Sequence, residues 1–179
     1  MKKIAVMLLV FVITFAAGCA TFNVNDYVGT GTPETRAFVY GYILYDEPFS
    51  EMSWLILLQA APKAENGGFR KYGAYIKKGI FFNGNLRLGS YKISQFGGGD
   101  SVYDLGSVTE GFRFEKPGIY YMGAYKVEKE KGMFASGFGL EKIDGIKEAD
   151  ILKPIVLLCA GTKWEEELNK RLNKLEAEK

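Results

Sequence analysis

Apolar residues are distributed in three different patterns along the chain, and each pattern predicts a different structure. Residues 4–15 form an unbroken apolar run behind Lys2 and Lys3. Residues 37–143 are rich in Tyr, Phe, Val and Ile and are punctuated by glycine, which favours strands over helices. From about residue 148, apolar residues recur at helical spacing. We therefore expect one mainly β domain over residues 37–179 that ends in a helical segment.

Several runs of the central region have the length and pattern of strands. One face of the first predicted strand carries Phe38, Tyr40, Tyr42 and Leu44, whereas the apolar run within 52–59 predicts a strand buried on both faces. The other predicted strands are 72–76, 79–82, 90–96, 101–105, 111–114, 119–128 and 133–142. Residues 129–132 suit the connection of an antiparallel hairpin between the last two. Many short strands at near-regular spacing indicate a sandwich or a barrel.

Two helices are predicted at the C-terminus. A short one covers about 150–159, with Pro154 limiting its start and Gly161 ending it. The second begins at a capping box formed by Thr162 and Glu165. Its apolar stripe is Trp164, Leu168, Leu172 and Leu175, and its expected ion pairs are Glu166 with Lys170 and Glu167 with Arg171. The stripe can pack on its own sheet or on another protein, and packing on the sheet is favoured.

The apolar run at the N-terminus ends in the tetrapeptide Ala16-Ala17-Gly18-Cys19. This tetrapeptide resembles the lipobox of bacterial lipoproteins. The resemblance implies that residues 1–18 are a signal peptide cut between Gly18 and Cys19, and that Cys19 carries a covalent lipid. A secretory signal cut elsewhere and a retained membrane anchor fit less well, because the apolar stretch of about 15 residues is shorter than the roughly 20 that span a bilayer.

The lipobox resemblance also predicts where the protein is found. Several acyl chains on one terminus make release from a membrane negligible. Ala20 behind the cysteine favours delivery to the outer membrane over the inner membrane of the bacterial cell envelope. Residues 20–36 are polar, contain glycine and proline, and show no sustained periodicity. We therefore expect 19–36 to be a lipidated N-terminus and flexible tether, with a coil length of about 20–25 Å.

A Gly-x-Tyr pattern occurs twice at the start of a predicted strand, as Gly89-Ser90-Tyr91 and as Gly118-Ile119-Tyr120. The glycine permits a sharp turn, and the tyrosine can send its hydroxyl back to the backbone, as in a tyrosine corner. The two segments resemble the strand starts of prealbumin-like, carboxypeptidase-regulatory-like modules of bacterial lipoproteins. That resemblance implies an antiparallel β-sandwich of about 7–9 strands with a C-terminal amphipathic helix.

Composition excludes several classes of function. The chain has no histidine, which excludes Ser-His-Asp and Cys-His nucleophiles and histidine-based zinc sites. Its net charge of +2 falls to 0 once Lys2 and Lys3 leave with the signal, so no nucleic-acid-binding surface is expected. The second cysteine, Cys159, lies in an apolar run and is expected to be a small core residue without a disulfide partner. No metal or cofactor is predicted apart from the lipid.

The acidic and glycine-rich segments give no diagnostic catalytic motif. The acids of the β region show no spacing typical of paired carboxylates; they include Asp46, Glu47, Asp100, Asp104, Glu110 and Glu115. The segment 97–101 lacks the lysine of a phosphate-binding loop, so a loop between strands is preferred. The segment 83–85 lacks the acids of a calcium loop and is expected to be a turn.

Aromatic residues make up 15% of the chain, and two roles are open for them. Packing is favoured over sugar stacking for Tyr40, Tyr42, Tyr45, Tyr72 and Tyr75. We therefore expect a membrane-anchored envelope lipoprotein that acts, without enzymatic turnover, as a binding or structural module for another envelope protein. A carbohydrate- or cell-wall-binding lipoprotein is the alternative hypothesis, and an acid-pair hydrolase is less favoured.

Overall fold

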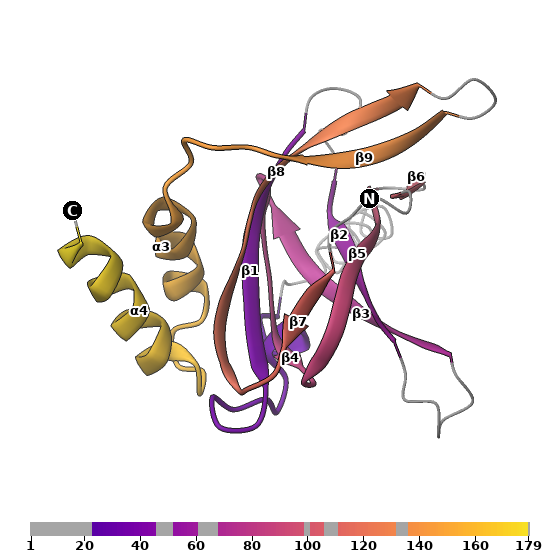
Figure 1. Ribbon diagram of the computed structural model, residues 1–179. Helices are drawn as coiled ribbons and strands as arrows, with labels where there is room; N and C mark the ends of the chain where they lie inside the picture. The colour runs from indigo at the N-terminus through magenta and orange to yellow at the C-terminus, as the bar shows by residue number, and fades with distance from the viewer. Residues whose placement is uncertain are drawn as a thin grey trace, which may run out of the picture.

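The computed structural model describes residues 23–45, 52–60, 68–98, 101–105, 111–131 and 136–178. These residues form a mainly β domain with two helices at its C-terminus (Figure 1). The strands are β1 (Ala37–Leu44), β2 (Trp54–Ala60), β3 (Phe69–Lys77), β4 (Ile80–Leu86), β5 (Gly89–Gly98), β6 (Ser101–Asp104), β7 (Phe112–Phe114), β8 (Gly118–Lys131) and β9 (Ser136–Lys142). The helices are α2 (Asn25–Val28), α3 (Glu148–Leu158) and α4 (Glu165–Ala177).

The described strands make one curved sheet in the order β6-β5-β2-β3-β4-β1-β8-β9, and β7 pairs with β5. A parallel bridge between Leu105 and Phe138 joins the β6 end to β9, so the sheet nearly closes into a barrel. The strand pair β1–β8 is parallel, whereas the other pairs of named strands are antiparallel. This single mixed sheet differs from the antiparallel sandwich predicted above. Alternation along a strand indicates which face is buried, but not which strand lies beside it.

The expected strands correspond closely to the observed ones, with differences at glycine- and asparagine-rich segments. The predicted turn at 83–85 lies inside β4, where the Asn83 Nδ2 donates a hydrogen bond of 2.6 Å to the Gly73 carbonyl. Gly97 and Gly98 belong to β5 instead of a loop. The β8–β9 hairpin is confirmed, but β8 continues to Lys131, so the connection comes later than 129–132.

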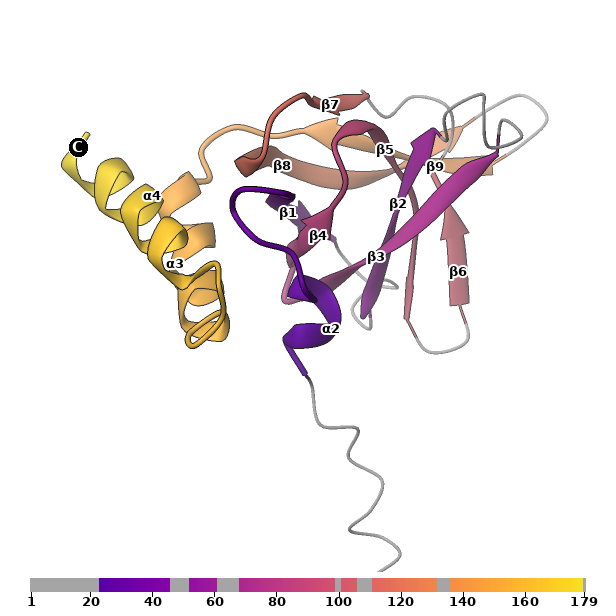
Figure 2. The same ribbon diagram turned by 90° about the horizontal axis from the view of Figure 1, so that it is seen from below.

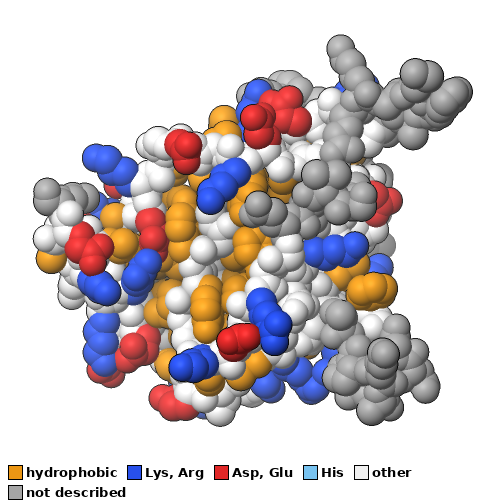
Figure 3. Space-filling model, viewed as in Figure 1, with side chains coloured by type: hydrophobic (Ala, Val, Ile, Leu, Met, Phe, Trp, Pro, Cys, Tyr) orange, Lys and Arg blue, Asp and Glu red, His pale blue; other side chains and the backbone are white. Residues whose placement is uncertain are grey.

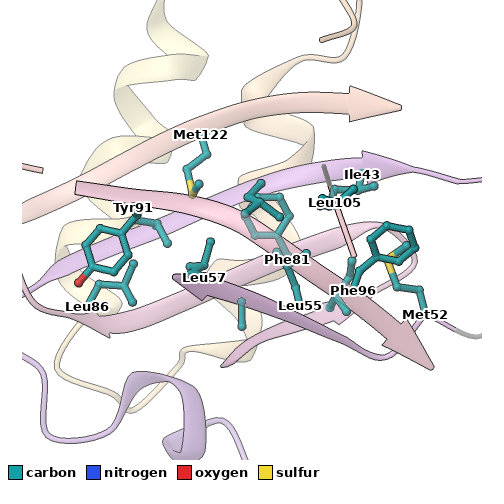
Figure 4. Close-up of a cluster of buried hydrophobic side chains, with 14 of the residues drawn as sticks. Ile43, Met52, Leu55, Leu57, Phe81, Leu86, Tyr91, Phe96, Leu105 and Met122 are labelled. Atoms are coloured by element: carbon teal, nitrogen blue, oxygen red, sulfur yellow. The ribbon is translucent and has the colours of Figure 1, made fainter. Parts of the chain in front are cut away.

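Two hydrophobic clusters lie on opposite sides of β1. The first fills the barrel interior and contains Val39, Ile43, Leu55, Leu57 and Phe81, all with no exposed surface (Figure 4). The second lies between the outside of the sheet and the helices; among its members are Phe38, Tyr40, Phe82, Ile151, Leu152, Trp164 and Leu168. Burial of the side chains in these two clusters supplies the main driving force for folding.

A strand is buried on both faces only where a helix covers its outer face. The helices cover β1, so Phe38 and Tyr40 face the second cluster while Val39 faces the first. Strand β2 was predicted to be buried on both faces, but only its inward residues are fully buried. Its outward residues, Trp54, Ile56 and Leu58, are half-buried. The prediction for β2 was therefore wrong, because the sequence of a strand does not show whether a helix covers it.

The C-terminal helices pack on their own sheet, as the favoured interpretation of the apolar stripe predicts. Trp164 and Leu168 are fully buried in the second cluster, and the Trp164 ring lies 5.2 Å from the Phe38 ring. The predicted capping box is wrong, because α4 begins at Glu165 behind Trp164, with no capping hydrogen bond from the Trp164 side chain. The Glu165 carboxylate instead accepts a hydrogen bond of 2.7 Å from the Gly161 N–H. No helix among the described residues is long and apolar enough to cross a membrane.

Most of the segment expected to be a tether is part of the folded domain. Val28 in α2 is 2% exposed, and the Tyr27 ring lies 5.6 Å from the Tyr75 ring. At the other end of the segment, the Gly118 N–H donates a hydrogen bond to the Arg36 carbonyl. Figure 2 shows α2 against β3 and β4, on the side of the barrel opposite to β7 and β8. The prediction of a tether over 19–36 was therefore wrong for residues 23–36. The segment is polar on average, and this average gave no sign that its few apolar side chains pack on the domain.

Candidate functional site

The two Gly-x-Tyr segments form the same local structure. Gly89 begins β5 with φ 146°, and Gly118 begins β8 with φ 142°. The Tyr91 hydroxyl donates to the Arg87 carbonyl and the Tyr120 hydroxyl to the Lys116 carbonyl, each at 2.7 Å. Each bond spans four residues, which confirms that the tyrosine hydroxyl returns to the nearby backbone. The tyrosines therefore close the turns that introduce the two strands.

Strand β7 joins these two corners. The ring of Phe114 lies 5.5 Å from the Tyr91 ring and 4.8 Å from the Tyr120 ring. Beside Tyr91, the buried Gln59 donates to the Leu88 carbonyl at 2.9 Å and accepts a hydrogen bond of 3.1 Å from Tyr72. Burial is the main cause of the raised pKa of Tyr91. These groups satisfy one another, so the cluster stabilises this end of the barrel and presents no activated hydroxyl.

A polar network connects the helices to the sheet. Glu148 of α3 accepts a hydrogen bond from the Tyr40 hydroxyl of β1, and Arg171 of α4 binds both carboxylate oxygens of Glu148 at 2.8 and 3.1 Å. Burial first, and the Glu148 carboxylate second, raise the pKa of Tyr40. Arg171 was expected to pair with Glu167, which instead pairs with Lys170, while the predicted Glu166–Lys170 pair is confirmed at 2.8 Å. The residues of this network are distant in sequence, and no motif indicates them.

Cys159 is a core residue. It has no exposed surface, and burial raises the pKa of its thiol to about 12. Because the thiolate is the nucleophilic form, this side chain is unreactive near neutral pH. The observation supports its interpretation as a small hydrophobic residue.

A groove of about 490 Å³ runs between α4, the segment that precedes β1, and the start of β8. Its apolar lining includes Pro33, Pro117 and Ile119, and charged side chains of α4, among them Lys170 and Lys174, form its rim. Lys174 is 66% exposed. Apolar residues within a charged, solvent-accessible rim are typical of a protein contact surface.

The candidate acids do not form a catalytic pair among the described residues. Asp104 accepts a hydrogen bond of 2.6 Å from Gln95, and Glu115 forms an exposed ion pair with Arg113 at 3.0 Å. The other four, Asp46, Glu47, Asp100 and Glu110, lie outside the described residues, as do Gly18 and Cys19. Within the described part of the chain, no group of three or more Cys, Asp or Glu residues could hold a metal ion.

The aromatic residues singled out from the sequence belong to the packing of the domain. Tyr40 and Tyr75 are buried in the second cluster, Tyr42 packs against it, and Tyr45 and Tyr72 pack against the first. Phe69, at 65%, is the one strongly exposed aromatic side chain in the described ranges.

The chain matches no protein-family model and no curated protein.

Proposed function

We propose that the protein is a lipid-anchored lipoprotein of the bacterial cell envelope, with the outer membrane favoured, and that its β domain binds another envelope protein without catalysing a reaction. The main support for this proposal is the tetrapeptide Ala16-Ala17-Gly18-Cys19, which directly follows a short apolar run. A lipid on Cys19 would confine the domain to a membrane surface and so raise its effective concentration toward partners there.

The arrangement of ionisable groups supports binding over catalysis. Among the groups with strongly raised pKa values, Tyr40, Tyr91 and Cys159 are buried in packing or bonded within structural networks. The fourth, Lys170, owes its raised pKa to exposed ion pairs with Glu166 and Glu167. Catalytic groups with shifted pKa values usually converge on an accessible cleft. A hydrolase that uses a pair of acids therefore has less support than a binding module.

The groove beside α4 is the best-supported contact surface for a protein partner. It combines apolar residues with exposed lysines and with Glu34 and Glu167. Figure 3 shows acidic and basic side chains interspersed over the helices, and apolar side chains gathered over the strands beside them. The prealbumin-like resemblance adds less to this proposal, since the strands form one mixed sheet.

Binding of a glycan has weaker support than binding of a protein. Stacking on a sugar needs an accessible ring face, but Trp164 is fully buried and Trp54 is half-buried. If a glycan is nevertheless the ligand, tryptophan fluorescence will change on titration with soluble glycans or cell-wall fragments. An unchanged spectrum across such a panel would remove this alternative.

The anchor is tested by intact-mass analysis of the protein purified from membranes of the source bacterium. We expect a chain that begins at Cys19 and carries the added mass of its acyl groups. The Cys19→Ser variant should remain unprocessed or leave the membrane, whereas the matched Cys159→Ser variant should be processed normally. A mature Cys19 without lipid would overturn the proposal.

The partner is sought by photo-crosslinking in intact cells. A photoreactive residue replaces Lys174 in the groove or, in a matched variant, exposed Arg113 in β7. We expect a discrete protein adduct from position 174 that the Lys170→Glu substitution weakens. If neither position gives a specific protein adduct while the protein remains lipidated, binding to a protein partner is wrong.

A further inference from the structure

The place where the chain leaves the domain toward Cys19 is fixed by the packing of α2. Tyr27 contacts Tyr75 and lies 6.3 Å from the Phe82 ring, and Val28 is buried. The N–H of Asn25 also donates a hydrogen bond of 3.0 Å to the Asn23 side chain. The described part of the chain therefore starts just before α2, which lies on the outer side of β3 and β4 (Figure 2).

Only four peptide steps separate Cys19 from Asn23. Four residues reach at most about 14 Å when fully extended. A folded domain of this size has a radius of gyration of about 15 Å. The link is thus shorter than the radius of the domain, so a lipid on Cys19 keeps the α2 side close to the bilayer.

A row of outward-facing residues continues from α2 across four strands. Tyr75, which Tyr27 covers, is paired with Trp54 of β2. Trp54 is paired with Gly97 of β5, which in turn is paired with Val102 of β6. We call these four residues, Tyr75, Trp54, Gly97 and Val102, the Trp54 row. Strands lie about 4.8 Å apart, so the row extends roughly 14 Å from Tyr75 to Val102.

Within the Trp54 row, Tyr75 is buried beneath Tyr27 of α2 and Gly97 is buried beneath the Trp54 indole, whereas Trp54 and Val102 do not lie under a described helix. Val102 is 59% exposed, and Trp54 is half-buried. The Trp54 indole lies across Gly97, where a Cβ would come within 2.2 Å of it. Ile56, two residues along β2, is also half-buried on this face. An amphipathic indole beside aliphatic side chains suits the boundary between lipid headgroups and acyl chains.

We propose that the Trp54 row lies against the lipid bilayer to which Cys19 is anchored, so that the domain has a fixed orientation with β7 and β8 directed away from the membrane. This inference rests on the proposed lipid anchor. It goes further by naming the surface that contacts lipid and by leaving the opposite side free for a protein partner. The row is apolar, so the contact depends little on salt.

The two tryptophans of the chain allow a direct test. The full-length acylated protein is reconstituted into phosphatidylcholine vesicles that contain a lipid with a nitroxide near its headgroup. In the Trp164→Phe variant the fluorescence comes from Trp54, and in the matched Trp54→Phe variant it comes from Trp164, which is buried beneath α4. We expect the nitroxide lipid to quench Trp54 severalfold more than Trp164, at low and at high salt.

A second comparison tests the short link. Insertion of 20 Gly/Ser residues between Ala20 and Thr21 should reduce the quenching of Trp54 severalfold while the protein stays with the vesicles. Equal quenching of the two tryptophans in vesicle-bound protein would overturn the orientation and leave the anchor intact. Failure of the processed chain to associate with vesicles would overturn the anchor and the orientation together. In the wild-type chain, which contains both tryptophans, the nitroxide lipid should quench only the part of the fluorescence that comes from Trp54. This measurement checks the orientation without either substitution.

Discussion

At the scale of single residues, Tyr91 and Tyr120 perform the same local task in different environments. Tyr91 is 2% exposed, whereas Tyr120 is half-buried. The Tyr91→Phe substitution should lower the free energy of unfolding by about 1 kcal/mol, because the part-buried hydrogen bond from the Tyr91 hydroxyl to the Arg87 carbonyl is lost. Tyr120→Phe should cost less than about 0.5 kcal/mol, since water can replace its hydroxyl. Urea denaturation of both variants checks this order, and equal losses would contradict it.

The burial of Cys159 makes a second prediction at this scale. Because the pKa of its thiol rises from 9.0 to about 12, the thiolate fraction at pH 8 is roughly a thousandfold smaller in the folded chain than in the unfolded chain. A thiol reagent should therefore label Cys159 of the acylated protein in urea but hardly at all in buffer. Rapid labelling of the native protein would show that the thiol is accessible.

The same shift has a defined effect on stability. A raised pKa in the folded state leaves the contribution of the neutral thiol intact below pH 9.0 and removes it as the pH rises toward 12. The decline in the free energy of unfolding above pH 9 should consequently be shallower in Cys159→Ala than in the wild-type chain. If the free energy of unfolding falls equally steeply above pH 9 in both chains, groups other than Cys159 cause the loss of stability at alkaline pH.

At the scale of secondary structure elements, Glu148 connects β1, α3 and α4. Its side chain is 17% exposed and bonded to both Tyr40 and Arg171. Glu148→Ala should cost about 2 kcal/mol, because the buried Tyr40 hydroxyl loses its acceptor and Arg171 loses its counter-charge. The control is Glu166→Ala, which removes a largely exposed ion pair and should cost less than about 0.5 kcal/mol. Thermal unfolding of the two variants measures the difference.

The helix α4 gives a second prediction for an element. Truncation after Gly161 removes Trp164 and Leu168, both without exposed surface, and uncovers Phe38. Cooperative unfolding should be lost. Trp164→Ala alone should cost about 3–5 kcal/mol, and Trp164→Phe should cost less because a ring remains in contact with Phe38. A truncated chain that unfolds as sharply as the wild type would show that the helix serves a partner instead.

Local patterns predicted these elements well and their assembly poorly. The alternation of residues and the glycine positions indicated the strands, and the Gly-x-Tyr segments indicated that the tyrosine hydroxyls bond to nearby backbone, which they do over four residues. By contrast, the Tyr40–Glu148 bond spans 108 residues, so no local pattern indicates it. The docking of residues 23–36 was missed for the same reason, since Tyr27 finds its partners in distant strands.

At the scale of the whole molecule, β1 holds the two layers of the domain together. It pairs antiparallel with β4 and parallel with β8, and its two faces belong to the two hydrophobic clusters. The sandwich that the sequence predicted would place consecutive strands side by side. In the structure, however, β1 lies between β4 and β8, which follow it much later in the chain. The barrel therefore depends on contacts between distant segments, and these are concentrated around β1.

Gly41 shows how narrow the space around β1 is. A Cβ at this position would lie 2.6 Å from the Phe81 ring and 2.7 Å from the Gly123 carbonyl oxygen, so β4 and β8 would both have to move. Gly41→Ala should therefore cost about 1–3 kcal/mol through overpacking. The matched variant is Gly73→Ala in β3, where a Cβ meets nothing within 4 Å, and replacing a strand glycine there should be neutral or slightly stabilising. Denaturant midpoints measured side by side decide the matter, because equal effects of the two alanines would mean that β1 is not packed between β4 and β8 as described.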